Sequence, residues 1–221
     1  MAINPELFTQ YDKALQLSVD GFIDELNKVI AKYEKMGTKE LTEALRLYYP
    51  ILINKYGDLA ASIAAEYYET SRELAGFTDL YSAVLADLPR EDELVSNVNY
   101  CLRNYEKHQN LERLQSAISG NATRHIMNAA EDTLFFNQNK DKVKSKWALV
   151  AHAGACAYCM MLSSRGFAYS NKDRANKSRH NSCRCTPVVD FNVLHPKLKG
   201  YSPEDNYKKW KELEANKKKD K

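Results

Sequence analysis

Apolar residues recur at steps of three and four along the first part of the chain, from Pro5 to Met36. Side chains at this spacing lie on one side of an α-helix, so the pattern predicts a long amphipathic helix with a narrow apolar stripe. Gly37 is typical of a residue that ends a helix, and Thr38 of a residue that caps the next one. The stripe consists of Phe8, Tyr11, Leu15, Val19, Phe22, Leu26, Val29 and Tyr33.

The same periodicity predicts more helices downstream. A second helical region is expected from Lys39 to about Ala75, broken or kinked at Tyr49-Pro50 because proline lacks a backbone N–H and restricts the residue before it. Gly76 is expected to end that region. The other predicted helices are a short one at 78–88 that Pro89 ends, two longer ones at 91–106 and 110–138, and a C-terminal helix from Pro203 onward.

The pattern changes after Asn139, where short apolar segments replace the long periodic ones. Segments 147–152, 166–169 and 186–191 are predicted strands, and 160–164 is predicted to form one turn of helix. Elements of this length bury little apolar surface, and small units built from them generally need a cross-link such as a metal ion.

Four of the five cysteines and one of the five histidines fall within positions 156–185. Cys156 and Cys159 form a Cys-x2-Cys pair, which places two thiolates on a tight turn where both can face one ion. His180, Cys183 and Cys185 follow, and they could complete a tetrahedral zinc site. These five candidates compete for four positions, and their spacing does not decide between a Cys₃His and a Cys₄ site.

We therefore predict a mainly α fold, with an N-terminal bundle of long helices and a small C-terminal zinc-stapled α+β module. The predicted domains are a helical domain at 1–139, the zinc-binding module at 140–195 and a basic C-terminal helix or tail at 196–221.

The composition is that of an ordinary soluble protein, with 44% hydrophobic and 28% charged residues in 221 positions. No apolar run reaches the roughly 18 residues of a membrane span, and the first residues lack the pattern of a signal peptide. We expect the chain to fold in a cytoplasm with no need for a membrane. A reducing compartment disfavours disulfides, which are the alternative explanation of the cysteine cluster.

A catalytic role of the cluster has weaker support than a structural metal site. A catalytic zinc would need an open coordination position and a general base, and Asp173 and Asp190 are the nearest acids in the sequence. Cys183 beside His180 could be a thiol nucleophile, but thiolates this close together indicate a metal. No phosphate-binding glycine loop, Gly-x-Ser-x-Gly or His-Glu-x-x-His motif occurs.

The fifth cysteine, Cys101, is predicted to lie in the core of the helical part.

Charge divides the chain into two parts. Residues 1–139 carry 13 Lys and Arg against 21 Asp and Glu, a net charge of −8, whereas residues 140–221 carry 19 against 8, a net charge of +11. The basic part could contact nucleic-acid phosphates, which makes a zinc-stapled DNA-binding protein an alternative function. The candidate contact residues are Arg165, Lys172, Arg174, Lys177, Arg179 and Arg184.

The cluster and its surroundings resemble a known family. The segments CAYCMMLSSRGFAY at 156–169 and HNSCRCTPVV at 180–189 are similar to the C-terminal signature of the MuF-like minor head proteins of tailed bacteriophages. The branch they most resemble is labelled head morphogenesis or capsid maturation protein in phages of actinobacteria. The helical segment 56–76 and Asp132-Thr133 are similar to the same branch, so the resemblance covers most of 40–191.

The resemblance implies a non-enzymatic minor capsid protein, present in several copies inside the capsid near the portal. Its implied partners are the portal protein and the major capsid protein, and packaged DNA is a further candidate. Its implied task is to assist head assembly, DNA packaging or ejection. The alternative function is an enzyme, either a capsid maturation protease or a metal-dependent nuclease, although no catalytic constellation in the sequence supports the protease label of some relatives.

Overall fold

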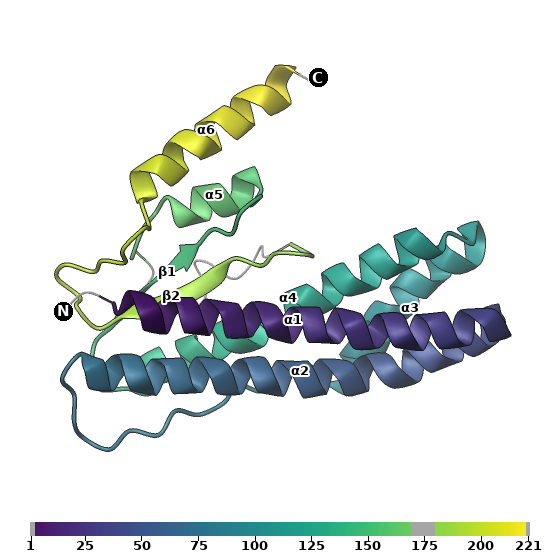
Figure 1. Cartoon of the computed structure of the whole chain (residues 1–221), viewed down its shortest axis with the longest axis horizontal. Coiled ribbons are helices and arrows are strands. Elements are labelled where there is room, and N and C mark those ends of the chain that lie inside the picture. Colours follow the sequence, from purple (N-terminus) through teal and green to yellow (C-terminus); the bar gives the residue numbers. More distant parts are fainter. Residues whose placement is uncertain (1–2, 169–179, 220–221) are drawn as a thin grey trace.

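The computed structural model describes residues 3–168 and 180–219, and the predicted mainly α fold is confirmed (Figure 1). Helices α1 (Pro5–Tyr33) and α2 (Thr38–Leu74) lie side by side and antiparallel. A single 3₁₀ turn, η1 (Glu34–Met36), joins them together with Gly37, whose φ of 133° favours glycine. Thr38 is the first residue of α2 rather than its cap.

Helix α2 continues without interruption through Pro50, so the predicted break at this position is wrong. A proline inside a helix costs about 3 kcal/mol because one hydrogen bond is lost and the ring crowds the preceding turn. The flanking side chains Tyr49, Leu52 and Ile53 are all buried in the core. Burial of these side chains on both sides of Pro50 offsets that cost.

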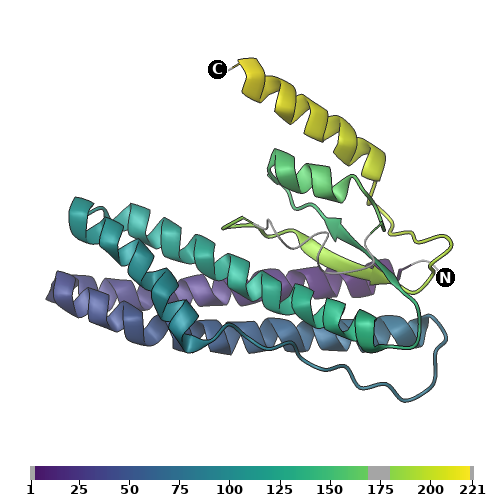
Figure 2. The ribbon, with the colours of Figure 1, turned by 180° about the vertical axis from the view of Figure 1, so that it is seen from behind.

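Helices α3 (Glu91–His108) and α4 (Leu111–Lys140) complete the helical part, as Figure 2 shows from behind. Helix α4 packs against α1, α2 and α3. It runs through Gly120 without a break, and both α3 and α4 agree with the predicted helices to within a few residues. Cys101 is buried in the core as predicted.

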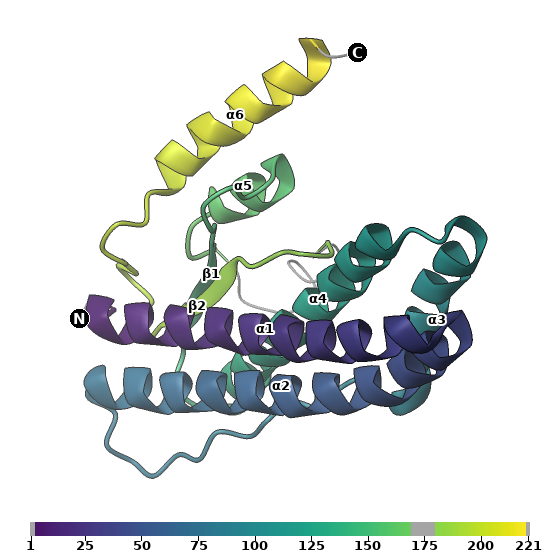
Figure 3. The same cartoon turned by 45° about the vertical axis from the view of Figure 1, so that its right-hand side comes forward.

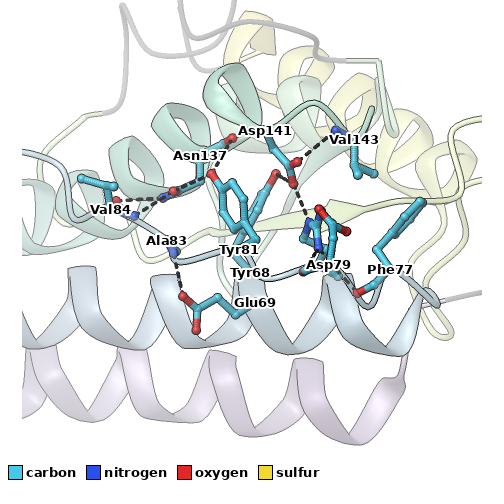
Figure 4. Close-up of polar contacts among 11 residues, drawn as sticks. Tyr68, Glu69, Phe77, Asp79, Tyr81, Ala83, Val84, Asn137, Asp141 and Val143 are labelled. Atoms are coloured by element: carbon cyan, nitrogen blue, oxygen red, sulfur yellow. Dashed lines mark hydrogen bonds and ion pairs between the residues drawn. The ribbon is translucent and has the colours of Figure 1, made fainter.

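A strap, residues 77–88, connects α2 to α3 without regular secondary structure, so the predicted helix at 78–88 is wrong. Side chains of α2 and α4 satisfy its backbone groups instead (Figure 4). Asn137 accepts from Val84 N at 2.8 Å and donates to Val84 O at 2.8 Å, and Glu69 accepts from Ala83 N at 2.6 Å. These contacts hold the strap extended along the helices.

A buried ion pair anchors the start of the strap (Figure 4). Arg72 of α2 lies 2.9 Å from Asp141, and each side chain is only 2% exposed. Tyr68 donates to the same carboxylate at 3.1 Å, and Arg72 also pairs with the largely exposed Asp79 of the strap at 2.7 Å. The hydrogen bond with Asp79 and the contact with Asp141 raise the pKa of Arg72, so the guanidinium stays charged.

The chain after α4 forms a two-stranded antiparallel sheet and two further helices. Strands β1 (Lys146–Val150) and β2 (Thr186–Asp190) pair so that Val150 lies opposite Thr186 and Lys146 opposite Asp190. Helix α5 (Ala157–Ser163) lies between the two strands in the sequence, and α6 (Pro203–Lys219) comes after β2 (Figure 1). The predicted strand at 166–169 is wrong for 166–168, which form no strand, and Tyr169 lies outside the described residues.

The sheet shares the core of the helices. Ala148, Val188 and Val189 belong to the same buried cluster as the apolar stripes of α1 and α2. A second, smaller cluster joins Phe135 and Trp147 to the buried cysteines. None of the described helices is both long and apolar enough to cross a membrane.

His125 of α4 should make stability depend on pH. The side chain is half-buried, and burial lowers its pKa from 6.5 to about 4, with a smaller contribution from Arg124. Between these two pH values the unfolded chain binds the proton and the folded chain does not, so stability should fall as pH drops from 6.5 to 4 by up to roughly 3 kcal/mol. Urea unfolding across this range should show a shallower pH slope for His125→Gln than for the unaltered chain, and equal slopes would contradict this prediction.

Candidate metal centre

The pairing of the two strands brings the cysteine pairs together. Val150 at the end of β1 lies opposite Thr186 at the start of β2. The segment that leaves β1 and the segment that enters β2 therefore lie at the same end of the sheet. The first carries Cys156 and Cys159 at the start of α5, and the second carries His180, Cys183 and Cys185.

All five candidate ligands lie close together, as the spacing predicted. Cys156 Sγ is 2.9 Å from His180 Nε2, and Cys159 Sγ is 3.4 Å from both His180 Nε2 and Cys183 Sγ. Adjacent ligand atoms around tetrahedral zinc lie about 3.5 to 3.8 Å apart, given metal bonds of about 2.0 Å to nitrogen and 2.3 Å to sulfur. A small outward movement of the ligands would therefore accommodate an ion, and the cluster could bind a metal.

The ligand atoms form two overlapping groups, each with its atoms within 4.8 Å of one another. One group is Cys156, Cys159 and His180, and the other is Cys159, Cys183 and Cys185. Cys159 belongs to both. None of these cysteines forms a disulfide, and the 3.4 Å between Cys159 and Cys183 exceeds the roughly 2.05 Å of an S–S bond.

The imidazole of His180 is oriented for a metal. Its Nδ1 lies 2.7 Å from the carbonyl oxygen of Asn181. A carbonyl only accepts, so Nδ1 carries the proton of this hydrogen bond, and in the neutral ring Nε2 then has a free lone pair. That lone pair faces Cys156 and Cys159, which is the arrangement of a metal-bound histidine with its outer nitrogen held by a carbonyl.

Crowding opposes ionisation of the thiols as long as no cation lies between them. Hydrogen bonds with Cys183 and Cys185, together with burial, raise the pKa of Cys159 far above its usual range. For Cys185, a hydrogen bond with Cys159 opposes the rise, but the contact with Cys183 and burial prevail and raise its pKa to about 12. Burial would raise the pKa of Cys156, yet the Cys159 N–H and His180 lower it overall. A bound cation would stabilise all of these thiolates.

Gly120 lets the ligand-bearing turn approach α4. Ser182 donates its backbone N–H to Gly120 O at 2.9 Å. A Cβ atom at position 120 would lie 2.7 Å from Ser182 Oγ and 3.3 Å from Asn181 Cβ. Gly120 is therefore a contact point between the cluster and the helical part, a role that a glycine inside a helical pattern can signal.

One side of α1 holds residues 184–186, which contain the last candidate ligand, Cys185, and the first residue of β2. Asp12, Gln16 and Asp20 are four residues apart and so lie in one row. Asp12 accepts from the Thr186 hydroxyl, Gln16 donates to Arg184 O at 3.1 Å, and Asp20 pairs with the Arg184 guanidinium at 2.7 Å. The sequence offered no motif for this row, although three polar residues at helical spacing beside an apolar stripe are a signal that could have been used.

Two of the six predicted nucleic-acid contacts, Arg165 and Arg184, lie in the described part of the chain. Arg184 is ion-paired with Asp20, and its side chain is 29% exposed. Arg165 is exposed after α5, where it contacts the sulfur of Met161 at 3.2 Å. The other four predicted contacts, Lys172, Arg174, Lys177 and Arg179, lie outside the described residues.

Of the two acids considered for catalysis, Asp190 is described, and it lies away from the cluster. Asp190 lies at the end of β2 opposite Lys146, about 13 Å along the strand from Thr186 at roughly 3.3 Å per residue. Its carboxylate is buried and accepts from the backbone N–H groups of Asn192 and Lys197. Asp173 lies outside the described residues.

Comparison with known proteins identifies the family to which the chain belongs. No curated protein and no solved structure matches the chain. A family model described as VG15 protein matches residues 2–213, which include every helix of the bundle, both strands and all five candidate metal ligands. The chain therefore belongs to the VG15 family, a family of phage proteins.

Proposed function

We propose that the protein is a non-enzymatic minor capsid protein of the phage head, associated with the portal inside the capsid. Membership of a phage protein family supports this role. The MuF-like signature at 156–189 supports the more specific assignment to head morphogenesis, with assembly, DNA packaging or ejection as the process that it assists.

The observation that carries the proposal is the cluster of four thiols and one imidazole at the junction between the sheet and the helices. Soft sulfur ligands with an imidazole favour zinc, and four such ligands close the coordination sphere. The two ligand groups contain no carboxylate that could act as a general base. These features support a structural zinc that holds β1, α5 and β2 together on α1 and α4.

The charge distribution suggests how the protein is oriented in the head. The helical part, residues 1–139, has a net charge of −8, and the remainder has a net charge of +11. In the proposed arrangement the acidic helices face the portal protein or the major capsid protein. The basic C-terminal part then faces the packaged DNA, whose phosphates attract Lys and Arg.

The location can be tested by quantitative mass spectrometry of purified particles of the phage that encodes this chain. We expect the protein in mature virions and in proheads, at a small fraction of the major capsid protein, and in the portal fraction after heads are disrupted. Its presence in infected cells but absence from both kinds of particle would contradict the proposal. Cleavage of the major capsid protein that depends on this chain would instead favour the maturation protease.

A further inference from the structure

Helix α6 projects from the body of the protein (Figures 1 and 3). It packs mainly against α5, where Asn206 donates to Ser163 Oγ at 2.8 Å and Tyr201 bonds to Ser163 O. Both contacts lie at or before the first turn of α6. Most of the stability of a helix in a protein comes from tertiary packing, so the rest of α6 would gain stability from a partner.

The outward side of α6 is aromatic and cationic. Tyr207 is 48% exposed, and Lys208 and Lys211 are exposed beside it. Lys211 Nζ lies 4.7 Å from the ring centre of Trp210 and 5.5 Å from that of Tyr207. Aromatic rings with a cation over them form a suitable surface for aliphatic side chains flanked by carboxylates.

Helix α2 carries a surface of that kind. Glu43, Leu47, Ile51 and Asp58 are spaced by four, four and seven residues, which keeps them on one side of the helix. All four are exposed, Leu47 at 60% and Ile51 at 53%. We call these four residues the α2 ridge. It is about 22 Å long at 1.5 Å per residue, close to the length of α6.

These two surfaces cannot meet within one chain. Helices α2 and α6 lie on opposite sides of the molecule in both Figure 1 and Figure 3, with α1 and the sheet between them. We propose that α6 of one copy docks on the α2 ridge of a second copy, with Tyr207 against Leu47 and Ile51 and the lysines near Glu43 and Asp58. Because the two surfaces differ, the contact is heterologous and would link successive copies head to tail into a ring or a chain.

Complementary single substitutions test this contact on the full-length protein by sedimentation equilibrium. Tyr207→Glu removes the docking surface of α6, and Ile51→Glu removes the ridge; both sites are exposed, so little loss of stability is expected. Each variant alone should self-associate at least about tenfold more weakly than the unaltered chain, as expected for loss of a central contact. An equimolar mixture of the two should form dimers and nothing larger. The intact α6 of Ile51→Glu can dock on the intact α2 ridge of Tyr207→Glu, and the dimer then has no intact surface left.

Leu17→Glu is the control, because Leu17 is 58% exposed on α1 outside both surfaces and its substitution should leave association unchanged. A monomeric unaltered chain, or a mixture that stays monomeric, would overturn the proposal. The proposal would also be overturned if Tyr207→Glu weakened retention of the protein on DNA and left its self-association unchanged, because α6 would then bind nucleic acid. None of these outcomes alters the expected presence of the protein in the virion.

Discussion

Replacing Cys159 with serine should yield a protein that no longer binds a stoichiometric metal ion and whose C-terminal module is unfolded. Cys159 belongs to both ligand groups, so its substitution leaves neither group with three ligand atoms. Structural zinc contributes an apparent 10 to 16 kcal/mol or so in small zinc-dependent folds, because ligand binding and folding are linked. Elemental analysis should find less than about a tenth of an ion per chain, and hydrogen exchange should accelerate across β1, α5 and β2.

The matched control is Cys101→Ser, the same substitution in the helical core and away from the cluster. This variant should keep the full metal content, with a moderate loss of stability from a polar atom in the core. If Cys159→Ser retains one metal ion per chain, or loses it without faster exchange in the module, the cluster does not act as a structural site.

Arg72→Ala should lower the free energy of unfolding by about 3 to 5 kcal/mol, the usual cost of removing one partner of a buried ion pair. The substitution leaves Asp141 buried and charged without its guanidinium, and it frees the strap from its contacts with Phe77 O and Asp79. Urea denaturation followed by circular dichroism measures the loss.

Two further variants show whether burial causes this effect. Arg90 pairs with Asp92 and Glu93 but is 74% exposed, so Arg90→Ala should cost less than about 1 kcal/mol. Arg72→Met combined with Asp141→Leu removes both charges and should recover much of the stability lost in Arg72→Ala. If Arg72→Ala and Arg90→Ala lower the free energy of unfolding by the same amount, the ion pair of Arg72 is not shielded from water, in contradiction to the structure.

The long helices could be predicted from the sequence because their stability depends on one local pattern. The part of the stripe from Tyr11 to Leu26 is buried, and α1 packs against α2 and α4, so the periodicity of these residues reports their burial directly. The strap carries equally apolar residues, yet Asn137, Glu69 and Thr133 bind its backbone in an extended form. Those partners are distant in sequence, so local propensity cannot reveal them.

The candidate site divides in the same way. The grouping of the five candidate ligands could be predicted because metal chemistry restricts residue types and spacing. The contacts that fix them on the helices were not, because Gly120 and the row Asp12, Gln16 and Asp20 contact residues 182–186 across long sequence separations. The ion pair of Arg184 could not be predicted for the same reason, since its partner Asp20 lies on the first helix.

The most direct test of a metal-stabilised structural protein is a native mass spectrum of the full-length chain, purified without chelators and without added metal. We predict the mass of the chain with one zinc ion and with the ligand thiols deprotonated to balance its charge. A spectrum that shows only the metal-free chain, under conditions in which the module remains folded, would contradict the central claim that a metal ion holds this part of the protein together.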